Sequence, residues 1–353
     1  MRKLRYYQAI NEAQRQSMEA DPSVLLLGIG VPGPTGIFGT TSGLVDRFGK
    51  DRVLDIPSSE QGMTGVALGM TVAGLRPVMI HIRVDFATLA MDQMVNQVAK
   101  WHFMYGGKLR APMVFRMIIG RGWGQGPQHS QSLQAWFAHI PGFKVVMPTT
   151  PHDVKGMLLA AIADDAPVVV FEHRWLYNIE GDVPEAPYKV SLDKANIVRR
   201  GRDVTLAGTS YMTLEALRAA ELLATLGIEA EVIDVRSIVP LDTATITASV
   251  KRTGALVVAD TGTIDFGVGA EIVSRVVEAD VSALRRSPRR VGLPYCPSPT
   301  SPALAEEFFP RAIHIVRQVG EMLGIDLARL PNEPSTGGGR WHDTPDASFT
   351  GPY

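Results

Sequence analysis

A single carboxylate, Glu60, stands directly before a glycine-rich stretch of this chain, in the segment Asp55–Gly69 (DIPSSEQGMTGVALG). The small residues that follow, Gly62 and Gly65 among them, let a flat ring or a neighbouring chain come close to the helix they are expected to form. A carboxylate held in such a place could exchange a proton with a bound heterocycle. A Glu in the first turn of a helix is also an ordinary capping residue that the helix dipole favours. This segment alone therefore leaves a catalytic and a structural role open.

Phe86 and His129 are two further side chains that could serve a ring-shaped ligand. An aromatic ring such as Phe86 can stack on a heterocycle, although a lone Phe at the end of a strand is more commonly part of a core. His129 lies in a loop rich in Gly and Pro, and histidine is the usual acid or base near neutral pH. A histidine in such a loop is more often a plain surface residue, so this side chain also has two interpretations.

Short apolar runs alternate with helical patterns through the first half of the chain. The predicted strands are Val24–Gly28, Arg52–Ile56, Val78–Ile82, Met113–Ile119, Phe143–Met147 and Pro167–Phe171. The predicted helices are Gln8–Ala20, Gly62–Ala73 and Met91–Lys100. Strands that are apolar on both faces and separated by helices indicate a mainly parallel sheet with helices on both sides. This first domain is expected to cover residues 1–180.

The alternation breaks at residues 181–202, a polar stretch with prolines and charges that we interpret as a linker. It resumes with predicted strands at Asp203–Gly208, Glu229–Asp234 and Ala255–Asp260 and helices at Thr213–Leu226 and from Gly267. We therefore predict an α/β fold of two domains with mainly parallel sheets, the second domain spanning 203–322 with one antiparallel edge strand. Residues 323–353 have no periodicity and are expected to be an extended or disordered tail.

Composition fits a soluble enzyme subunit. The chain has 353 residues, of which 45% are hydrophobic and 20% charged, enough for two cores. Its net charge of −1 gives no electrostatic reason to expect nucleic acid or an anionic membrane as a partner. The single cysteine, Cys296, excludes an intrachain disulfide and a cysteine metal cluster. The start of the chain suggests an amphipathic helix without a signal peptide's apolar run, so we expect a cytoplasmic location.

Three segments together resemble the beta subunit of thiamine-diphosphate-dependent 2-oxoacid dehydrogenases, the decarboxylating component of pyruvate dehydrogenase and its relatives. They are the SEQG run at Glu60, the run Met91–Lys100 (MDQMVNQVAK) after Phe86, and Gly122–Pro148 (GWGQGPQHSQSLQAWFAHIPGFKVVMP). Asp234–Leu241 (DVRSIVPL) extends the resemblance into the second half. It implies a transketolase-like pyrimidine-binding domain followed by a transketolase C-terminal-like domain.

The resemblance assigns roles to the three candidate side chains. Glu60 would face the N1′ nitrogen of the cofactor's aminopyrimidine, where protonation favours the imino tautomer that removes the C2 proton. Phe86 would stack on the same ring. His129 would orient the 2-oxoacid or act during reductive acylation of a lipoyl group.

A potassium site is also implied by the resemblance, built from backbone carbonyls and one carboxylate, as suits a hard cation. The matching residues are Met113, Ala161, Ile162, Asp164 and Ala166. Asp164 and its neighbour Asp165 could equally form a solvated turn.

Magnesium and the diphosphate are held in thiamine enzymes by a GDG motif and a later Asn. No GDG occurs in this sequence, because Gly181-Asp182-Val183 lacks the second Gly. The resemblance therefore implies an alpha subunit that holds magnesium and the diphosphate, in an α2β2 heterotetramer, with a lipoyl acyltransferase as a further partner.

Two features depart from the resembled family. Ile29 and Gly30 stand where two acids are usual, so the polar relay between the two cofactor sites cannot run as in pyruvate dehydrogenase. The loop Gly30–Gly43 and the strand Ile80–Arg83 (IHIR) also differ, which indicates a remodelled substrate pocket.

Three functions compete on these grounds. The first is the beta subunit of a 2-oxoacid dehydrogenase, which decarboxylates a 2-oxoacid and passes the acyl group to a lipoyl acceptor. The second is a subunit of a two-gene transketolase-like enzyme that transfers a two-carbon ketol unit, and the altered loop favours it. The third is a catalytically silent partner subunit. Intact Glu60, Phe86 and His129 argue against the third, because nothing structural requires all three together.

Overall fold

The computed structural model describes residues 2–120 and 125–327. The described residues form two compact units, the first made of 2–119 and 136–192 and the second of 120, 125–135 and 193–327. Most of the predicted tail, residues 328–353, lies outside the described residues. Each unit is presented by itself below.

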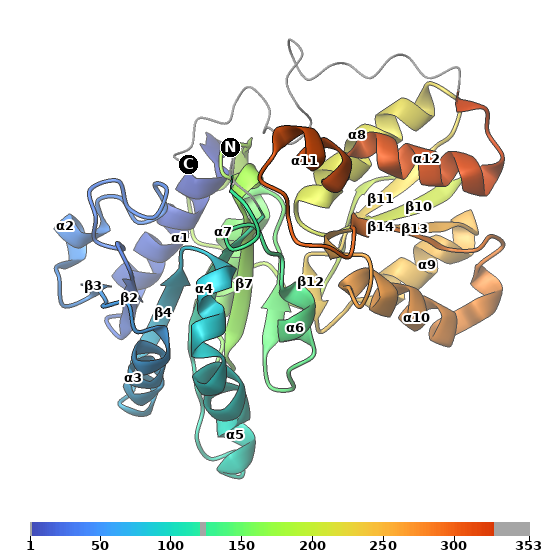
Figure 1. The fold of residues 1–353 in the computed structure, drawn as a ribbon. Helices are drawn as coiled ribbons and strands as arrows, with labels where there is room; N and C mark the ends of the chain where they lie inside the picture. The colour runs from blue at the N-terminus through green and yellow to red at the C-terminus, as the bar shows by residue number, and fades with distance from the viewer. Residues whose placement is uncertain (1, 121–124, 328–353) are drawn as a thin grey trace. The chain divides into compact units, whose positions relative to one another are not determined.

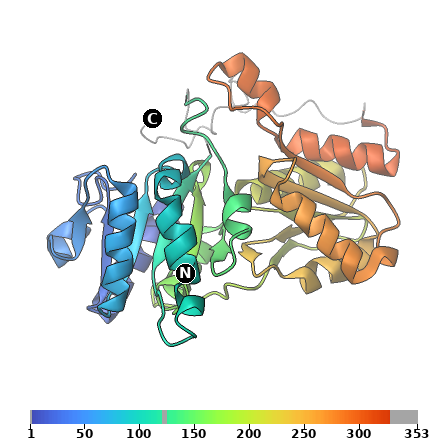
Figure 2. The same ribbon diagram turned by 60° about the horizontal axis from the view of Figure 1, so that its bottom comes forward.

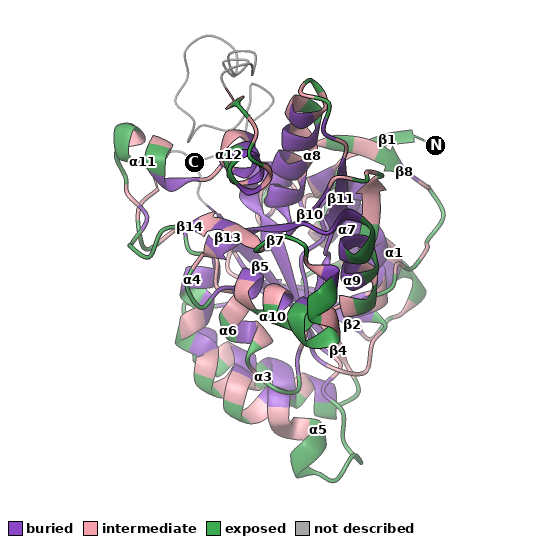
Figure 3. Ribbon diagram, turned by 90° about the vertical axis from the view of Figure 1, so that its right-hand side faces the viewer, coloured by how far each residue is buried: buried purple, intermediate pink, exposed green. Residues whose placement is uncertain are grey.

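The first unit is built on a parallel sheet. Its strands are β2 (Val24–Gly28), β3 (Val53–Asp55), β4 (Arg76–His81), β5 (Val114–Ile119), β6 (Lys144–Val146) and β7 (Val168–His173). Their order is β6-β7-β5-β4-β2-β3, and every pair of neighbours is parallel. The strands β2, β5 and β7 are buried at every residue, as continuous apolar runs require (Figure 3). The predicted parallel sheet is confirmed.

Helices cover both faces of this sheet (Figure 1). The helices α1 (Tyr6–Ala20) and α7 (Pro151–Ile162) pack against each other on one face, and α3 (Glu60–Val72) and α4 (Val84–Ala87) lie on the other. Shorter helical segments are α2 (Leu44–Phe48), α5 (Trp101–Met104) and the 3₁₀ turns Thr88–Ala90 and Arg174–Leu176. The short helix α6 (Gln134–Ala138) begins in the second unit, and its residues from Trp136 on belong to the first. Because parallel strands end at one edge of a sheet, the residues that follow β2, β3, β4 and β7 gather there.

The predicted helix Met91–Lys100 is wrong in detail. A π-helical turn occupies Gln93–Gln97 and a 3₁₀ turn follows at Val98–Lys100. A π-helical turn is wider than an α-helical turn and occurs mostly as a local bulge inside an α-helix. Here the side chain of Gln93 lies against α3: a Cβ placed on Gly65 would come within 3.3 Å of Gln93 Oε1.

A strand precedes the predicted helix Gln8–Ala20, and the expected linker contains strands as well. The strand β1 (Arg2–Arg5) precedes α1 and pairs antiparallel with β8 (Glu180–Val183), with Arg2 opposite Val183. A second strand in the expected linker, β9 (Asn196–Arg199), joins the sheet of the second unit. Neither pairing has a local signal in the sequence, because each partner strand is remote in the chain.

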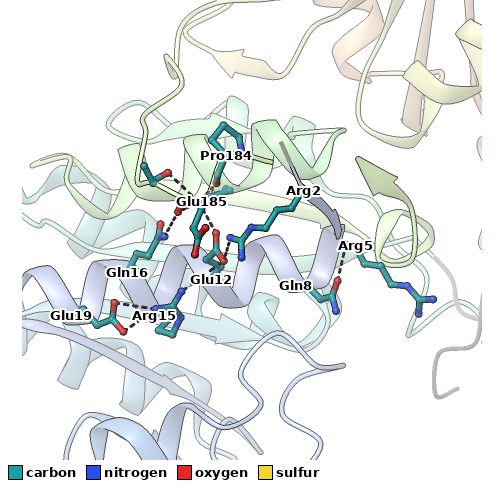
Figure 4. A network of polar contacts seen from close by, with 11 residues as sticks. Arg2, Arg5, Gln8, Glu12, Arg15, Gln16, Glu19, Pro184 and Glu185 are labelled. Carbon is teal, nitrogen blue, oxygen red and sulfur yellow. Dashed lines mark hydrogen bonds and ion pairs between the residues drawn. The ribbon is translucent and has the colours of Figure 1, made fainter. Parts of the chain in front are cut away.

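A polar network fastens α1 to residues 184–186 (Figure 4). Lys155 on α7 is completely buried, and its ammonium group donates to Glu12 Oε1 at 2.6 Å and to the carbonyl of Pro184 at 2.6 Å. Glu12 also forms an ion pair with Arg2, and the amide of Gln16 donates to the carbonyl of Glu185 at 2.8 Å. The first and last parts of this unit are thereby held together.

The second unit contains a sheet of order β14-β13-β10-β11-β9. Its strands are β10 (Val204–Gly208), β11 (Ala230–Asp234), β13 (Leu256–Thr263), β14 (Arg289–Leu293) and β9, and β12 (Ser237–Val239) follows β11 in the chain. All its pairs are parallel except the edge pair of β9 with β11, as predicted.

Two pairs of helices pack on this second sheet (Figures 1 and 2). The helices α8 (Tyr211–Ala224) and α12 (Ala312–Leu323) contact each other on one face, and α9 (Thr243–Thr253) and α10 (Val268–Asp280) contact each other on the other. The turn Val281–Ala283 and helix α11 (Pro302–Phe308) complete the unit. Among the described residues, no helix is long and apolar enough to cross a membrane.

Candidate active site

Glu60 is the first residue of α3 and is almost buried, with 9% of its surface exposed. The preceding residue, Ser59, makes no side-chain capping bond to the helix. Within residues 2–120 and 125–327, the Glu60 carboxylate has no hydrogen bond or ion pair of its own. The helix dipole favours a negative charge at this end. A nearly buried carboxylate with open acceptor sites is suited to a donor brought by a ligand.

Phe86 lies on α4, directly after β4, with 39% of its surface exposed. Exposure on this scale leaves part of the ring accessible for stacking. Arg83, three residues earlier, is almost fully buried, and this burial lowers its pKa. Phe86 and Glu60 both follow strands of one parallel sheet, at the edge where α/β folds bind ligands.

His81, the last residue of β4, is a buried histidine that the sequence did not single out. Its ring stacks on Phe115, with centroids 6.4 Å apart and an interplanar angle of 18°. Burial lowers the pKa of His81 to about 4, so the ring is neutral near pH 7. Within the described part of the chain, its Nε2 atom has no hydrogen-bond partner.

The loop after β2 is tied into the sheet at several points. The backbone N–H of Gly30 donates to the Asp55 carboxylate at 2.8 Å, and Gly30 has a φ of 72°, which favours glycine. The carbonyl of Thr40 accepts a 2.6 Å hydrogen bond from the buried Gln14. The ring of Phe38 lies 4.3 Å from the guanidinium carbon of Arg174. The acid-free stretch at Ile29 and Gly30 is thus an ordered part of this edge.

Arg174 follows β7 and is buried between two rings. Its guanidinium carbon also lies 4.9 Å from the ring centre of Tyr177. Burial is the main reason that the pKa of Arg174 falls to about 10, and the charge of Arg83 lowers it further. A positive charge therefore persists near neutral pH at this edge of the first unit.

His129 belongs to the second unit, in the segment 125–135. It is partly buried, and its backbone N–H donates to the carbonyl of Gly126 at 3.2 Å. The neighbouring Ser130 is fully buried and its hydroxyl donates to the carbonyl of Gln125 at 3.0 Å. The structure therefore brings Glu60 and Phe86 to one sheet edge and places His129 in the other unit.

The five residues of the expected potassium site lie in the first unit, and cationic side chains already contact two of them, Ile162 and Asp164. Arg76 donates to the carbonyls of Ile162 at 3.2 Å and Asp164 at 2.9 Å. Lys144 forms a 2.5 Å ion pair with the Asp164 carboxylate. The carbonyls of Met113 and Ala161 accept backbone hydrogen bonds from Val168 and Asp164, and the N–H of Ala166 donates to the Asp164 side chain. A potassium ion here would share its oxygens with these donors.

No group of three or more His, Cys, Asp and Glu side chains that could hold a metal ion occurs in the described residues. The residues present fit the pyrimidine half of a thiamine diphosphate site, through Glu60 and Phe86.

Two known domain families match this chain, one over the region of the first sheet and the other over the region of the second. The transketolase pyrimidine binding domain family matches residues 2–180. The transketolase C-terminal domain family matches residues 193–315.

Several proteins are similar over nearly the whole chain. The acetoin:2,6-dichlorophenolindophenol oxidoreductase subunit beta of Cupriavidus necator is 42% identical over 324 residues, which cover 89% of this chain and 96% of that protein. The mitochondrial pyruvate dehydrogenase E1 component subunit beta-1 of Oryza sativa is 41% identical over 314 residues, covering 88% and 84%. The corresponding subunit beta of Saccharomyces cerevisiae is 38% identical over 324 residues, covering 90% and 88%.

A solved structure described as a split gene transketolase, inactive beta4 tetramer, has the same fold. The TM-score is 0.73 at 23% sequence identity, and the match covers 91% of this chain and 98% of that one. At this identity the likeness concerns the fold alone.

Proposed function

This chain belongs to the family of beta subunits of thiamine-diphosphate-dependent 2-oxoacid dehydrogenases, and from that membership we propose how it works. It supplies the pyrimidine-binding half of the active site of an enzyme that decarboxylates a 2-oxoacid and passes the acyl group to a lipoyl acceptor. This assignment is supported by the matches of the two transketolase domain families to residues 2–180 and 193–315, and by the relatives that are about 40% identical.

One observation carries the proposal: Glu60 begins α3 with a nearly buried carboxylate whose acceptor sites are open within the described residues. A carboxylate in such a place can hold a proton in a fixed position against a ring nitrogen. Bound thiamine diphosphate would supply a nucleophilic carbon and an electron sink for the decarboxylation. Glu60 would hold and return the proton at N1′, and Phe86 would fix the plane of the ring by stacking.

His129 has a later task in this proposal. A partly buried imidazole can orient the substrate's carboxylate and exchange a proton when the acyl group leaves for its acceptor. Its place in a turn fixed by backbone hydrogen bonds favours a defined orientation of the ring.

A separate alpha subunit would complete the site with magnesium and the diphosphate-binding residues. The support is the missing GDG motif and the lack, among described residues, of a clustered set of metal-binding side chains. We propose an α2β2 heterotetramer, and a lipoyl acyltransferase as the acceptor of the product. Potassium stays a weaker proposal, since Arg76 and Lys144 already contact Ile162 and Asp164.

A second candidate substrate is a neutral acyloin rather than a 2-oxoacid. Two of the similar proteins, from Cupriavidus necator and Bacillus subtilis, are named acetoin:2,6-dichlorophenolindophenol oxidoreductase subunit beta, at 42% and 40% identity. The ketol-transferring alternative has weaker support, because the likeness to a split gene transketolase is one of fold.

The deciding experiment uses the chain co-expressed with an alpha subunit, loaded with thiamine diphosphate and magnesium. Reduction of 2,6-dichlorophenolindophenol is followed with a series of 2-oxoacids and, separately, with acetoin. Turnover of a 2-oxoacid with release of carbon dioxide supports the first proposal, and turnover of acetoin alone supports the second. Transfer of a ketol unit between sugars, without dye reduction by either substrate, would overturn both.

A further inference from the structure

The segment that carries His129 is anchored to the sheet of the second unit by one buried side chain, Gln134. Gln134 has no exposed surface, and its amide group donates to Asp260 Oδ1 at 3.0 Å and to Thr261 Oγ1 at 3.3 Å. Asp260 and Thr261 lie within β13. The anchor therefore joins the loop to a rigid strand across 126 positions of sequence.

Asp260 is the centre of this anchor. Besides Gln134, its Oδ1 atom accepts from Thr209 Oγ1 at 2.5 Å and from the backbone N–H of Thr261 at 2.9 Å. Only 3% of Asp260 is exposed, and burial raises its pKa. Three donors converging on one buried oxygen fix the carboxylate in a single orientation.

The space around the anchor is filled. A Cβ added to Gly262 would come within 2.8 Å of Gln134 Nε2 and 3.1 Å of Asp260 Oδ2. No residue with a side chain fits at this position unless the anchor shifts, so the glycine permits the close approach.

The other end of the segment is also held. The N–H of His129 donates to the carbonyl of Gly126, and a Cβ on Gly126 would come within 2.5 Å of Thr300 Oγ1. The fully buried Ser130 bonds to the carbonyl of Gln125. His129 thus lies between two fixed points, Gly126 and Gln134.

This anchor leaves two buried oxygens with no hydrogen bond in the described residues, Gln134 Oε1 and Asp260 Oδ2. A buried acceptor without a partner destabilises the folded state. Apolar side chains of similar volume would fill the same space without that cost. The geometry that this polar pair imposes on the segment therefore explains it better than stability does.

We propose that Asp260 and Gln134 are positioning residues that hold His129 in place for the transfer of the acyl group to its acceptor. The proposal rests on the transfer role of His129 proposed above. It gives strand β13, which carries no residue assigned to the cofactor, an influence on the second half of the reaction.

The test compares four variants in the reconstituted enzyme: Gln134→Met, Asp260→Leu, Asp260→Asn and His129→Ala. Gln134→Met keeps the volume and removes the amide, and Asp260→Asn keeps an Oδ1 acceptor. Two rates are measured, loss of the 2-oxoacid with a dye as acceptor and transfer of the acyl group to dihydrolipoamide. Hydrogen–deuterium exchange of peptides that cover residues 125–135 reports the anchor independently of activity.

Gln134→Met and Asp260→Leu are expected to slow transfer about 10- to 100-fold, as a displacement near 1 Å does. The dye-coupled rate should change much less, exchange in 125–135 should rise, and Asp260→Asn should retain most of the transfer rate. Unchanged exchange and transfer in Gln134→Met would overturn the proposal, and so would an equal fall of both rates. If His129→Ala leaves transfer intact, the proposed role of His129 is wrong even where the exchange data confirm the anchor.

The variant Gln134→Glu adds a further measurement, the pH dependence of the transfer rate, which a purely structural role of Gln134 would leave unchanged. Gln134→Glu places a second carboxylate against Asp260, and two such groups cannot both ionise at hydrogen-bond distance. At low pH one proton bridges the pair and restores the anchor, so transfer relative to the unaltered protein should fall as pH rises. A ratio that does not change with pH would contradict the positioning role.

Discussion

Arg116 and Glu172 lie diagonally across the adjacent strands β5 and β7, opposite Val170 and Ile118, and form an ion pair with no exposed surface. Two hydrogen bonds join them, Nε to Oε1 at 2.5 Å and Nη2 to Oε2 at 2.7 Å. Tyr177 donates to Glu172 at 2.7 Å, and Gln14 on α1 accepts from Arg116 at 2.6 Å. This buried network joins the sheet to α1 and to the segment after β7, beside the proposed site.

Removal of one partner should therefore destabilise the first unit strongly. Arg116→Met leaves the charge of Glu172 buried, and the expected loss is about 3–5 kcal/mol in the free energy of unfolding. Urea denaturation followed by circular dichroism measures it. The double variant Arg116→Met/Glu172→Met should recover much of the loss, since no uncompensated charge remains.

A matched control is available on the surface of α1. Arg15 and Glu19 form an i,i+4 ion pair with roughly a third of each side chain exposed (Figure 4). Arg15→Met should cost less than about 1 kcal/mol. An equal loss in the free energy of unfolding in Arg15→Met and Arg116→Met would contradict the larger stabilising effect that we assign to the buried pair.

Glu60→Gln should preserve folding and assembly and remove nearly all decarboxylation, because an amide cannot exchange the proton at N1′. A loss of about 10²–10⁴-fold in kcat is expected for a general acid–base group. Release of carbon dioxide by the reconstituted pair measures it. The control is Glu271→Gln, an exposed glutamate in the first turn of α10, which should leave kcat unchanged. If Glu60→Gln keeps most of its activity, the role given to Glu60 is wrong.

Phe86 should contribute mainly to binding of the cofactor. Phe86→Leu removes the aromatic ring, and the lost stacking, about 0.5–1.5 kcal/mol, should weaken thiamine diphosphate binding by up to about tenfold. Fluorescence titration of the assembled enzyme measures the Kd. Phe86→Tyr keeps the ring and should bind normally. Equal binding by the Leu and Tyr variants would exclude stacking at this position.

His81 should make the first unit sensitive to acid. The pKa of His81 lies near 4 in the folded chain, below the ordinary value of 6.5, so the unfolded chain binds this proton more readily. The neutral His81 therefore contributes fully to the stability of the fold above pH 6.5. As pH falls towards 4 this contribution is lost, and the free energy of unfolding decreases by roughly 3 kcal/mol. His81→Phe should therefore flatten the pH dependence of Tm over this range. The exposed His139 is the control, and His139→Phe should melt with the original pH profile.

The assembly is predicted to be an α2β2 heterotetramer. Val66 and Val72 on α3 and Leu89 after α4 are large apolar residues about half exposed or more, which favours their burial by another chain. Light scattering of the co-expressed pair should give the mass of two copies of each subunit. A stable 38 kDa monomer that ignores the alpha subunit would contradict the prediction.

Periodicity predicted the strands β2, β5, β7, β10 and β11 to within one or two residues, because each is a continuous apolar run between turn signals. The helix at Glu60 begins two residues earlier than predicted, since Ser59 rather than Gly62 marks its start. Pairings of polar strands such as β1 with β8 could not be predicted, because nothing local distinguishes them from loop or helix.

The site was only partly predictable for the same reason. Glu60 and Phe86 could be proposed from motifs, and their common sheet edge follows from parallel strands. The contact of Gln134 with Asp260 spans the chain and leaves no spacing to detect. His81 looked like any other histidine until its burial was known. The roles of all these residues, and the cytoplasmic location, stay predictions.

The pairing of β1 with β8 has a consequence for how the protein is made. Arg2 leaves the ribosome well before its strand partner, Val183, which lies in a distant part of the chain. The contact of Glu12 with Lys155 likewise forms only after Lys155, 143 positions later in the chain, has been synthesised. Contacts between such distant residues form slowly. The segment that carries Arg2 and Glu12 must therefore stay without these partners, and within reach of chaperones, until translation has passed Val183.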